Sequence, residues 1–306
     1  MQTPVASRSL VTPARRTLLV QLGFLLPGIA YVLLFFAYPL FNNLNMSFRD
    51  YTTRSFLTGE APWIGFNNYQ EVIGFQYFER VLWNTFWFTV LSIAGQFTIG
   101  LLVALYFRRR FPGNQVLRGM LLVSWLIPLI ASTAVWRWML DKDNGVINLF
   151  LDNVTPGSVS PGWLSSTSLA LIACVLVNIW IGIPFNAALL YAGLQDIPRD
   201  VYEAATVDGA SSVQTFRRIT WPLLRPTVTV VLVLGVVYTI KVLDIILGLT
   251  GGGPAYASQT MATQAYQFSF EQFEFGQGAA MGNLLMLVTL VFALVYLRMN
   301  RRSVDD

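Results

Sequence analysis

Side chains that carry enzyme chemistry are scarce in this sequence. It contains no histidine and a single cysteine, Cys174, so no His or Cys ligand set for zinc, haem or an iron–sulfur cluster can form within the chain. Lys142 and Lys241, the two lysines, follow no G-x-x-x-x-G-K-[ST] pattern, and no nucleotide site of the P-loop type is expected. We therefore expect no catalytic residues, no metal and no cofactor in this chain, and Cys174 to be a packed small residue.

Two charged residues, Lys241 and Asp244, stand three positions apart in an apolar run. Each would cost about 2.5–3.5 kcal/mol alone at the centre of a transmembrane helix. Counting about 1.5 Å per residue from Pro226 places them roughly 22 Å and 27 Å along a helix, near the outer interface, where pairing and snorkelling lower that cost. A structural ion pair is the favoured interpretation, and a role in an outer gate is the alternative.

Polar and aromatic side chains inside apolar runs could line a route for a solute. Asn178 and Asn186 are eight positions apart, which places them close to one helical face. Trp180 and Tyr238 add aromatic surface, and Pro184 predicts a kink. Amides and aromatic rings suit uncharged hydroxylated solutes, because they offer paired hydrogen bonds and apolar stacking. Such residues also hold membrane helices together, so both interpretations stay open.

The stretch EAATVDGASSVQTFRRITWPLLRP, residues 203–226, is polar and tightly punctuated. Asp200 followed by Glu203, and Ser211 followed by Gln214, have the spacing of a capping box, so each pair can begin a helix. Gly209 can leave a helix in the left-handed conformation without steric cost.

These signals predict two short helices, about Val201–Asp208 and Ser212–Trp221, joined by a tight turn. The second should end there, because Pro222 is unsuited to a helix interior. Its residues Val213, Phe216 and Ile219 share one face, and Phe216 and Ile219 should tie the loop to the rest of the protein. Ala204 and Ala205 remove bulk from the first helix and would let another surface approach closely.

The elements that must position these residues are membrane helices. Apolar residues make up 55% of the sequence and charged residues 12%, with a mean hydropathy of +0.55, whereas soluble domains carry about a quarter charged residues. A bilayer core needs about 20 apolar residues of helix, and six segments qualify. They are about Leu18–Leu40, Leu82–Phe107, Leu117–Leu140, Ser168–Leu194, Pro226–Leu247 and Ala279–Leu297.

Arginine placement predicts the orientation, because positively charged loops stay in the cytoplasm. With the N-terminus inside, fourteen arginines fall in the inner segments, namely Arg8, Arg15, Arg16, Arg108, Arg109, Arg110, Arg118, Arg199, Arg217, Arg218, Arg225, Arg298, Arg301 and Arg302. Only five basic residues fall outside, namely Arg49, Arg54, Arg80, Arg137 and Lys142. Both termini and residues 203–226 are therefore expected in the cytoplasm, and the net charge of +4 needs no nucleic-acid partner.

The stretch 203–226 resembles the cytoplasmic EAA loop of permease subunits in binding-protein-dependent ABC importers. The matching residues are Glu203, Ala204, Ala205, Asp208, Gly209, Ala210, Phe216, Ile219, Pro222, Leu223 and Pro226. The resemblance continues from about Tyr38 onward. YPLFNNLNMSF, LIPLIASTAVWRWML, NIWIGIPFNAALLYAGLQDIP and LTGGGPAYASQT are similar to the sugar and glycerol-3-phosphate branch, of the maltose type.

The resemblance implies an all-α permease domain over 17–306, with six transmembrane helices and a coupling loop at about 195–225. The first 15 or so residues show no resemblance, and residues 1–16 are expected to form a cytoplasmic tail. It implies a prokaryotic plasma (inner) membrane, a second and different permease subunit, and two copies of an ATPase subunit that bind ATP and Mg. An extracytoplasmic solute-binding protein would deliver a sugar-like solute, and the turn at Gly251–Gly253 would contact that protein. In such families the loop docks into a cleft of the ATPase, and Glu203 and Gly209 would carry the coupling.

Two other classes are weighed against an importer permease that is no enzyme by itself. A secondary transporter driven by an ion gradient predicts several buried carboxylates at mid-membrane, whereas only Asp244 falls within an expected span. A membrane enzyme would need a convergent catalytic set, and the spans contain almost no ionisable groups. The identity of the solute does not follow from the sequence.

Overall fold

A computed structural model describes residues 13–109, 111–155 and 160–301 of the chain. Regular structure in these residues is helical, apart from two isolated β-bridges that join Arg49 to Trp63 and Thr52 to Glu274. This confirms the expected all-α class. The expected tail over 1–16 overlaps the first helix, which begins at Pro13, and residues 1–12 lie outside the described residues.

The elements are α1 Pro13–Val32, the π-helical turn η1 Leu33–Ala37, α2 Tyr38–Met46, α3 Thr53–Thr58, α4 Asn67–Gly74, α5 Phe78–Phe107, α6 Asn114–Leu126, α7 Leu129–Met139, α8 Val146–Val154, α9 Ala170–Gln195, α10 Arg199–Val207, α11 Ser212–Thr215, the π-helical turn η2 Phe216–Thr220, α12 Trp221–Thr239, α13 Asp244–Leu249, α14 Met261–Tyr266, the π-helical turn η3 Gln267–Glu271 and α15 Phe275–Arg301.

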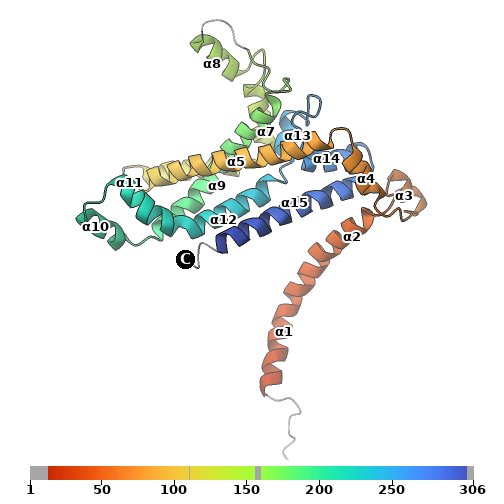
Figure 1. Ribbon diagram of the computed structural model, residues 1–306, viewed down its shortest axis with the longest axis horizontal. Helices are drawn as coiled ribbons and strands as arrows, with labels where there is room; N and C mark the ends of the chain where they lie inside the picture. The colour runs from red at the N-terminus through yellow and green to blue at the C-terminus, as the bar shows by residue number, and fades with distance from the viewer. Residues whose placement is uncertain (1–12, 110, 156–159, 302–306) are drawn as a thin grey trace, which may run out of the picture.

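Long apolar helices account for the expected spans. Among the described residues, five helical stretches are long and apolar enough to cross a membrane, and a bent pair, α6 with α7, makes a sixth candidate. The five are Gln21–Met46, Phe78–Phe107, Ala170–Gln195, Ser212–Thr239 and Phe275–Leu294. Helices α5, α9, α12 and α15 lie alongside one another as a bundle (Figure 1).

The third expected span is not one straight helix. α6 and α7 meet at an angle of 93°, and the break falls at Ile127 and Pro128, which both have extended ψ values. Proline has no N–H to donate and pushes the residue before it out of the helical region. The apolar run is therefore continuous while its helix is broken.

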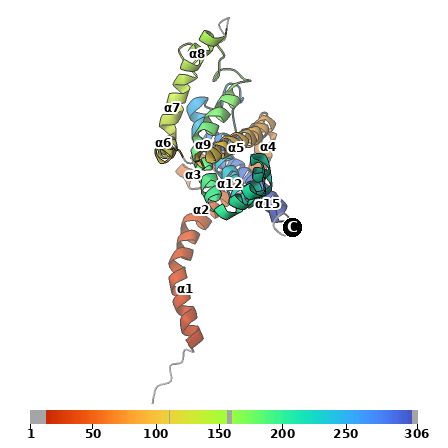
Figure 2. The same ribbon diagram turned by 90° about the vertical axis from the view of Figure 1, so that its left-hand side faces the viewer.

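Helix α1 stands away from the bundle in both views (Figures 1 and 2). None of the most apolar window of Gln21–Met46 is buried within the chain. The run is tied to the rest at its far end, where Asn43 on α2 donates a hydrogen bond to Asn283 on α15 at 2.8 Å. A wholly apolar helix without protein contacts is stable only against lipid or another subunit.

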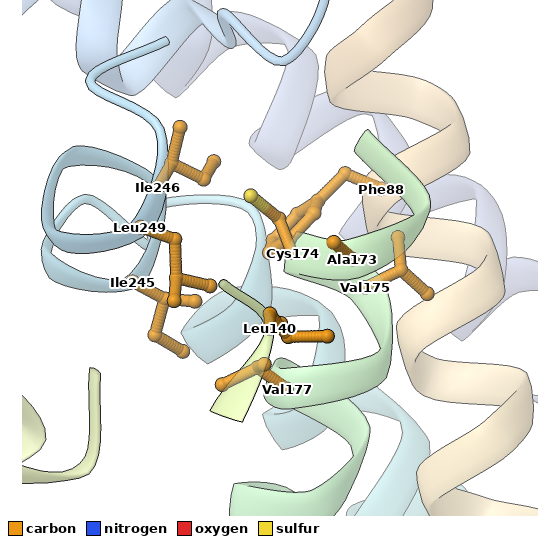
Figure 3. Packing of buried hydrophobic residues seen from close by; sticks show 9 residues of the cluster. All are labelled: Phe88, Leu140, Ala173, Cys174, Val175, Val177, Ile245, Ile246 and Leu249. Carbon is orange, nitrogen blue, oxygen red and sulfur yellow. The ribbon is translucent and has the colours of Figure 1, made fainter. Parts of the chain in front are cut away.

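An apolar core forms where α13 packs against α9. Figure 3 shows this cluster, to which α5 contributes Phe88, and Leu140 follows α7. Its other members are Ala173, Cys174, Val175, Val177, Ile245, Ile246 and Leu249. Cys174 is fully buried there, with its sulfur 3.8 Å from the hydroxyl of Thr250, which confirms the prediction of a packed small residue.

The connection that leads into α15 carries one carboxyl with a shifted pKa. Partial burial raises the pKa of Glu274, and the negative charges of Asp50 and Glu71 raise it further. The folded state therefore binds this proton more tightly than the unfolded state does. The ionised carboxylate lowers the stability of the fold at high pH, and this penalty disappears as pH falls below the ordinary glutamate pKa.

We predict that Glu274→Gln raises the thermal unfolding midpoint at about pH 8 and that the difference shrinks to nothing toward about pH 4. Thermal unfolding of the purified chain in detergent across that range measures both. The exposed Glu271→Gln serves as the control. An unchanged midpoint at pH 8, or a difference that grows as the pH falls, would contradict the prediction.

Candidate functional site

The first short helix of the EAA loop, residues 195–225, is α10. It begins at Arg199, with Pro198 as its N-cap at φ −57° and ψ 141°. The expected capping box at Asp200 and Glu203 is wrong, because Asp200 lies inside the first turn. Proline has the right φ to begin a helix and gives up no needed N–H there, and the Asp200 carboxylate interacts favourably with the helix dipole.

The turn that ends α10 has the predicted geometry. Gly209 has φ +73°, the left-handed region that favours glycine. The N–H of Ala210 donates to the carbonyl oxygen of Ala205 at 2.9 Å, and the N–H of Gly209 donates to that of Thr206 at 3.1 Å. This pair of bonds is a Schellman motif, which satisfies carbonyls left free at the helix end.

The second helical segment begins as predicted and continues further. Ser211 and Gln214 form a reciprocal capping box, with distances of 3.3 Å and 2.8 Å. The expected end near Trp221 is wrong: the helix runs from Ser212 to Thr239 without interruption. Within it, the π-helical turn η2 ends at Thr220, two residues before Pro222. A π-turn redirects the backbone hydrogen bonds, and we attribute the tolerance of the proline to it.

The outward face of the EAA loop combines acidic and apolar groups. Glu203, Ala204 and Asp208 are exposed, whereas Ala205, which was expected to let another surface approach, is buried within the chain. Beside them, Val207 is 88% exposed and Val213 is 67% exposed. Phe216 and Ile219, which were expected to tie the loop to the bundle, are half-buried, whereas Val213 on the same face is exposed. The loop therefore presents uncovered apolar side chains next to two carboxylates.

Tyr202 fastens α10 to two membrane helices. Its hydroxyl lies 3.1 Å from the hydroxyl of Thr220, just before α12. The guanidinium of Arg108, at the end of α5, stacks over the Tyr202 ring at 3.8 Å. Sequence reasoning missed both partners, because no local pattern links Tyr202 to Thr220, 18 positions away, or to Arg108, which precedes it by about ninety positions. A displacement of α10 would act on α5 and α12 together.

The asparagines proposed for the solute route are buried between α5 and α9. Gln96 on α5 donates to the carbonyl oxygen of Asn178 at 2.9 Å. Asn186 donates to the carbonyl oxygen of Gly182 at 2.9 Å and to the Gln96 amide oxygen at 3.4 Å. Of the two interpretations left open, this geometry supports helix packing for Asn186. The bond to Asn178 reaches only its backbone carbonyl, and the side-chain nitrogen of Asn178 is buried without a hydrogen-bond partner among the described residues. Gln96 is the member of the cluster that the sequence reasoning missed.

Aromatic side chains form a separate group on α6, α9 and α12. The rings of Trp125 and Phe185 stack at 5.6 Å, and Tyr238 meets Phe185 edge-on at 6.3 Å. Tyr238 is exposed and Phe185 half-buried, so this row borders open space. Trp180 lies apart from it, in edge contact with Trp136 at 5.6 Å.

The expected ion pair between Lys241 and Asp244 is wrong in its geometry. α12 ends at Thr239 and α13 begins at Asp244, so the two residues do not share a helical face. In the described structure Lys241 lies over the Tyr238 ring, with its amine 5.2 Å from the ring centre. Both charged groups are exposed. Their role in a gate stays a prediction.

Metal chemistry finds no support in the described residues. No three His, Cys, Asp or Glu side chains there are grouped so that they could bind an ion.

Comparisons with known proteins agree on one class. Residues 96–304 match the family described as "Binding-protein-dependent transport system inner membrane component". The chain is 36% identical to the trehalose/maltose transport system permease protein MalF of Thermococcus litoralis, over 92% of this chain and 94% of that protein. It is 32% identical to the sulfoquinovosyl glycerol transport system permease protein SmoG of Agrobacterium fabrum, over 92% and 91%.

A solved structure shares the fold. The bacterial alginate ABC transporter, in complex with an alginate pentasaccharide-bound periplasmic protein, contains a chain that matches with a TM-score of 0.79 at 24% identity, over 94% of this chain and 95% of that one.

Close packing at the Gln96 cluster yields a test. A methyl group added at Gly182 would overlap the Gln96 side chain. We predict that Gly182→Ala lowers the free energy of unfolding by about 1–3 kcal/mol. In a protein that already carries Gln96→Ala, the same substitution should lower the free energy of unfolding much less. Thermal unfolding in detergent measures the double-mutant coupling.

Gly235→Ala is the matched control, because its added methyl would meet Ile93 only at an ordinary 3.8 Å. Equal losses for Gly182→Ala with and without Gln96 would contradict a packing role for the cluster.

Proposed function

Because this chain belongs to the family of binding-protein-dependent transport system inner membrane components, we propose that it is one half of a heterodimeric pore in an ATP-driven importer. The importer moves a sugar-like solute into the cell, and a separate ATPase supplies the energy. The observation that carries this proposal is the EAA loop, whose outward face is uncovered while Tyr202 fastens it to α5 and α12.

The outward face of the loop suits a protein partner. Val207 and Val213 would gain by leaving water, and Glu203 and Asp208 would meet basic groups on the ATPase. Ala204 has no bulk to hold the two surfaces apart. Two ATPase copies, one for each permease, would bind ATP and Mg, so this chain needs neither.

Coupling would follow from the attachments of the loop. When ATP draws the two ATPase subunits together, each carries its docked α10 with it. The Schellman turn at Gly209 joins α10 to the helix that becomes α12, and Tyr202 joins α10 to Arg108 on α5. A shift of the loop would therefore tilt both helices and switch the pore between inward-open and outward-open states.

Helix α1 supports a second permease subunit. Its run Gln21–Met46 has no buried surface in the apolar window and stands off the bundle (Figure 2). A different permease would cover part of that surface, and lipid would cover the rest.

The solute class rests on the named relatives and on the aromatic row. The proteins that resemble this chain transport trehalose or maltose and sulfoquinovosyl glycerol by their names. Trp125, Phe185 and Tyr238 offer ring faces, which suit the apolar faces of sugar rings. We place the translocation route along this row. Asn178, Asn186 and Trp180 are not part of the row, and contact with the solute stays a prediction for them.

The loop end of the bundle is proposed to face the cytoplasm, because Arg108, Arg109, Arg118 and Arg199 gather there. Both termini would share that side. The opposite connections, including the turn at Gly251–Gly253, would meet the solute-binding protein. A secondary transporter gains no support, since no Asp or Glu is buried among the described residues.

Gly209 provides a test of the coupling role. A β-branched residue at φ +73° is strained by roughly 1–2 kcal/mol or more, and the turn must open to relieve it. We predict that Gly209→Val lowers solute uptake about tenfold while the complex still assembles.

Gly59→Val is the matched control for that variant. Gly59 has the same φ of +73°, and an added Cβ meets nothing within 4 Å at either site, yet Gly59 lies outside the EAA loop. Solute uptake and co-purification of the ATPase subunit are measured for both variants, so that a loss of coupling is distinguished from a loss of assembly. Equal uptake in the two variants would remove the coupling role.

Energy dependence separates the importer from its rival. In proteoliposomes that contain the chain, its permease partner, the ATPase and the binding protein, we predict that uptake requires ATP and survives a protonophore. Uptake without ATP that collapses with the ion gradient would contradict the proposal.

A further inference from the structure

A basic cavity of about 970 Å³ lies beside the EAA loop. It is bounded by the end of α5, the start of α6, the end of α9 and the start of α10. Four arginines line it, namely Arg108, Arg109, Arg118 and Arg199, and no carboxylate is among the lining residues. Guanidinium groups keep their charge at any physiological pH, so the cavity attracts anions.

Two helix N-termini add to this field. α6 begins at Asn114 after Gly113, and α10 begins at Arg199 after Pro198. Neither has a side-chain cap, and the first residues of both line the cavity. Free N–H groups and the positive end of a helix dipole favour phosphate-like groups. Asp200 offsets part of the dipole of α10, whereas the first turn of α6 has no acidic residue, so α6 is the stronger of the two N-termini.

Two of the four arginines, Arg108 and Arg118, are held against aromatic rings. Arg118 lies over the Tyr191 ring at 4.3 Å, and Arg108 lies over the Tyr202 ring at 3.8 Å. Stacking occupies the face of a guanidinium and leaves its in-plane N–H groups free to donate. The Nε of Arg118 is buried and has no hydrogen-bond partner among the described residues. An unpaired buried donor lowers the stability of the fold, and a bound hydrogen-bond acceptor would remove this penalty.

A second, apolar cavity continues from the first. It measures about 300 Å³ and shares Phe107, Gln115, Arg118 and Tyr191 with the basic cavity. The other residues that line it are all apolar or glycine, namely Gly119, Leu121, Leu122, Pro184, Ala187 and Ala188. Pro184 is seven residues before Tyr191 on α9, which is roughly 10 Å along the helix. The polar mouth therefore leads into an apolar chamber between α6 and α9.

We propose that the two cavities together bind one anionic phospholipid. The arginines and helix N-termini would hold the phosphate, and an acyl chain would fill the apolar chamber. A soluble phosphate would use the basic cavity alone, and a zwitterionic headgroup would bring a cation toward four arginines. Basic pockets between membrane helices are suited to anionic headgroups.

The lipid would also brace the EAA loop. Arg199 and Tyr202 belong to α10 and line the same cavity as Arg108 and Arg118. A bound phosphate would join α10 to the ends of α5 and α6. Lipid binding is measured without solute and without the ATPase, so its test stands apart from the transport assays.

Lipid retention by the purified full chain tests the proposal. The chain is stripped in detergent, titrated with phosphatidylglycerol or phosphatidylcholine of equal acyl composition, and read by native mass spectrometry. We expect phosphatidylglycerol to bind more tightly. Arg118→Gln with Arg199→Gln should weaken it about twenty-five-fold, at about fivefold for each arginine.

Arg217→Gln with Arg218→Gln is the matched control, because these exposed arginines stand at the same end of the bundle but outside the cavity. Its binding should stay within about twofold of the parent. Equal binding of the two lipids, or an equal loss in the control, would overturn the proposal.

A variant of the apolar chamber distinguishes binding of a lipid from binding of a free phosphate. This test remains valid even if the arginine variants do not fold. Gly119→Leu adds bulk where a new Cβ meets nothing within 4 Å. It should weaken phosphatidylglycerol several-fold and leave competition by glycerol phosphate unchanged. If Gly119→Leu has no effect and glycerol phosphate displaces the lipid at equal concentration, the site binds a soluble anion and the proposal fails.

Discussion

The packing of α5 against α9 is the constraint on which the rest of the structure depends. Glycines make the approach close: a methyl group at Gly95 would overlap Ile179, and one at Gly100 would come within 2.7 Å of the Asn186 Cβ. Small residues let membrane helices interlock where no hydrophobic effect drives them together. Buried amides of Gln96 and Asn186 add hydrogen bonds that have no competitor in lipid. The pair is thereby fixed in register.

This fixed pair explains how a polar loop at one end could control a pore. α9 leads directly into α10, and α5 ends at the arginine that stacks on Tyr202. The EAA loop thus rests on two points of one rigid unit and continues into α12 by a helix without interruption. The same two helix ends form walls of the basic cavity. The loop, the pore helices and the cavity are all attached to the α5–α9 pair. A ligand that binds to one of them would therefore shift the conformation of the others.

Local chemistry accounts for what the sequence predicts well. Glycine at position 209 and the Ser211/Gln214 box act over a few residues, and the structure has both. The apolar runs predict the spans because the thickness of the bilayer core fixes the length of a transmembrane helix. Prediction fails where distant contacts decide. Nothing near Thr239 breaks a helix by composition, yet α12 ends there and α13 packs against α7 and α9. The contact of Tyr202 with Arg108 and the burial of Asn178 likewise depend on which helices become neighbours. Pro128 itself could have predicted the break between α6 and α7, but the continuous apolar run favoured a single span.

Cross-linking at Ala204 tests the central claim most directly. The chain has one cysteine, Cys174, which is buried, so Cys174→Ala provides a thiol-free background for Ala204→Cys. The account predicts a cross-link from this exposed site to the ATPase subunit in membranes, with a yield that changes when ATP is added. A residue that forms no adduct with the ATPase, or that reacts with an impermeant thiol reagent from outside the cell, would contradict it.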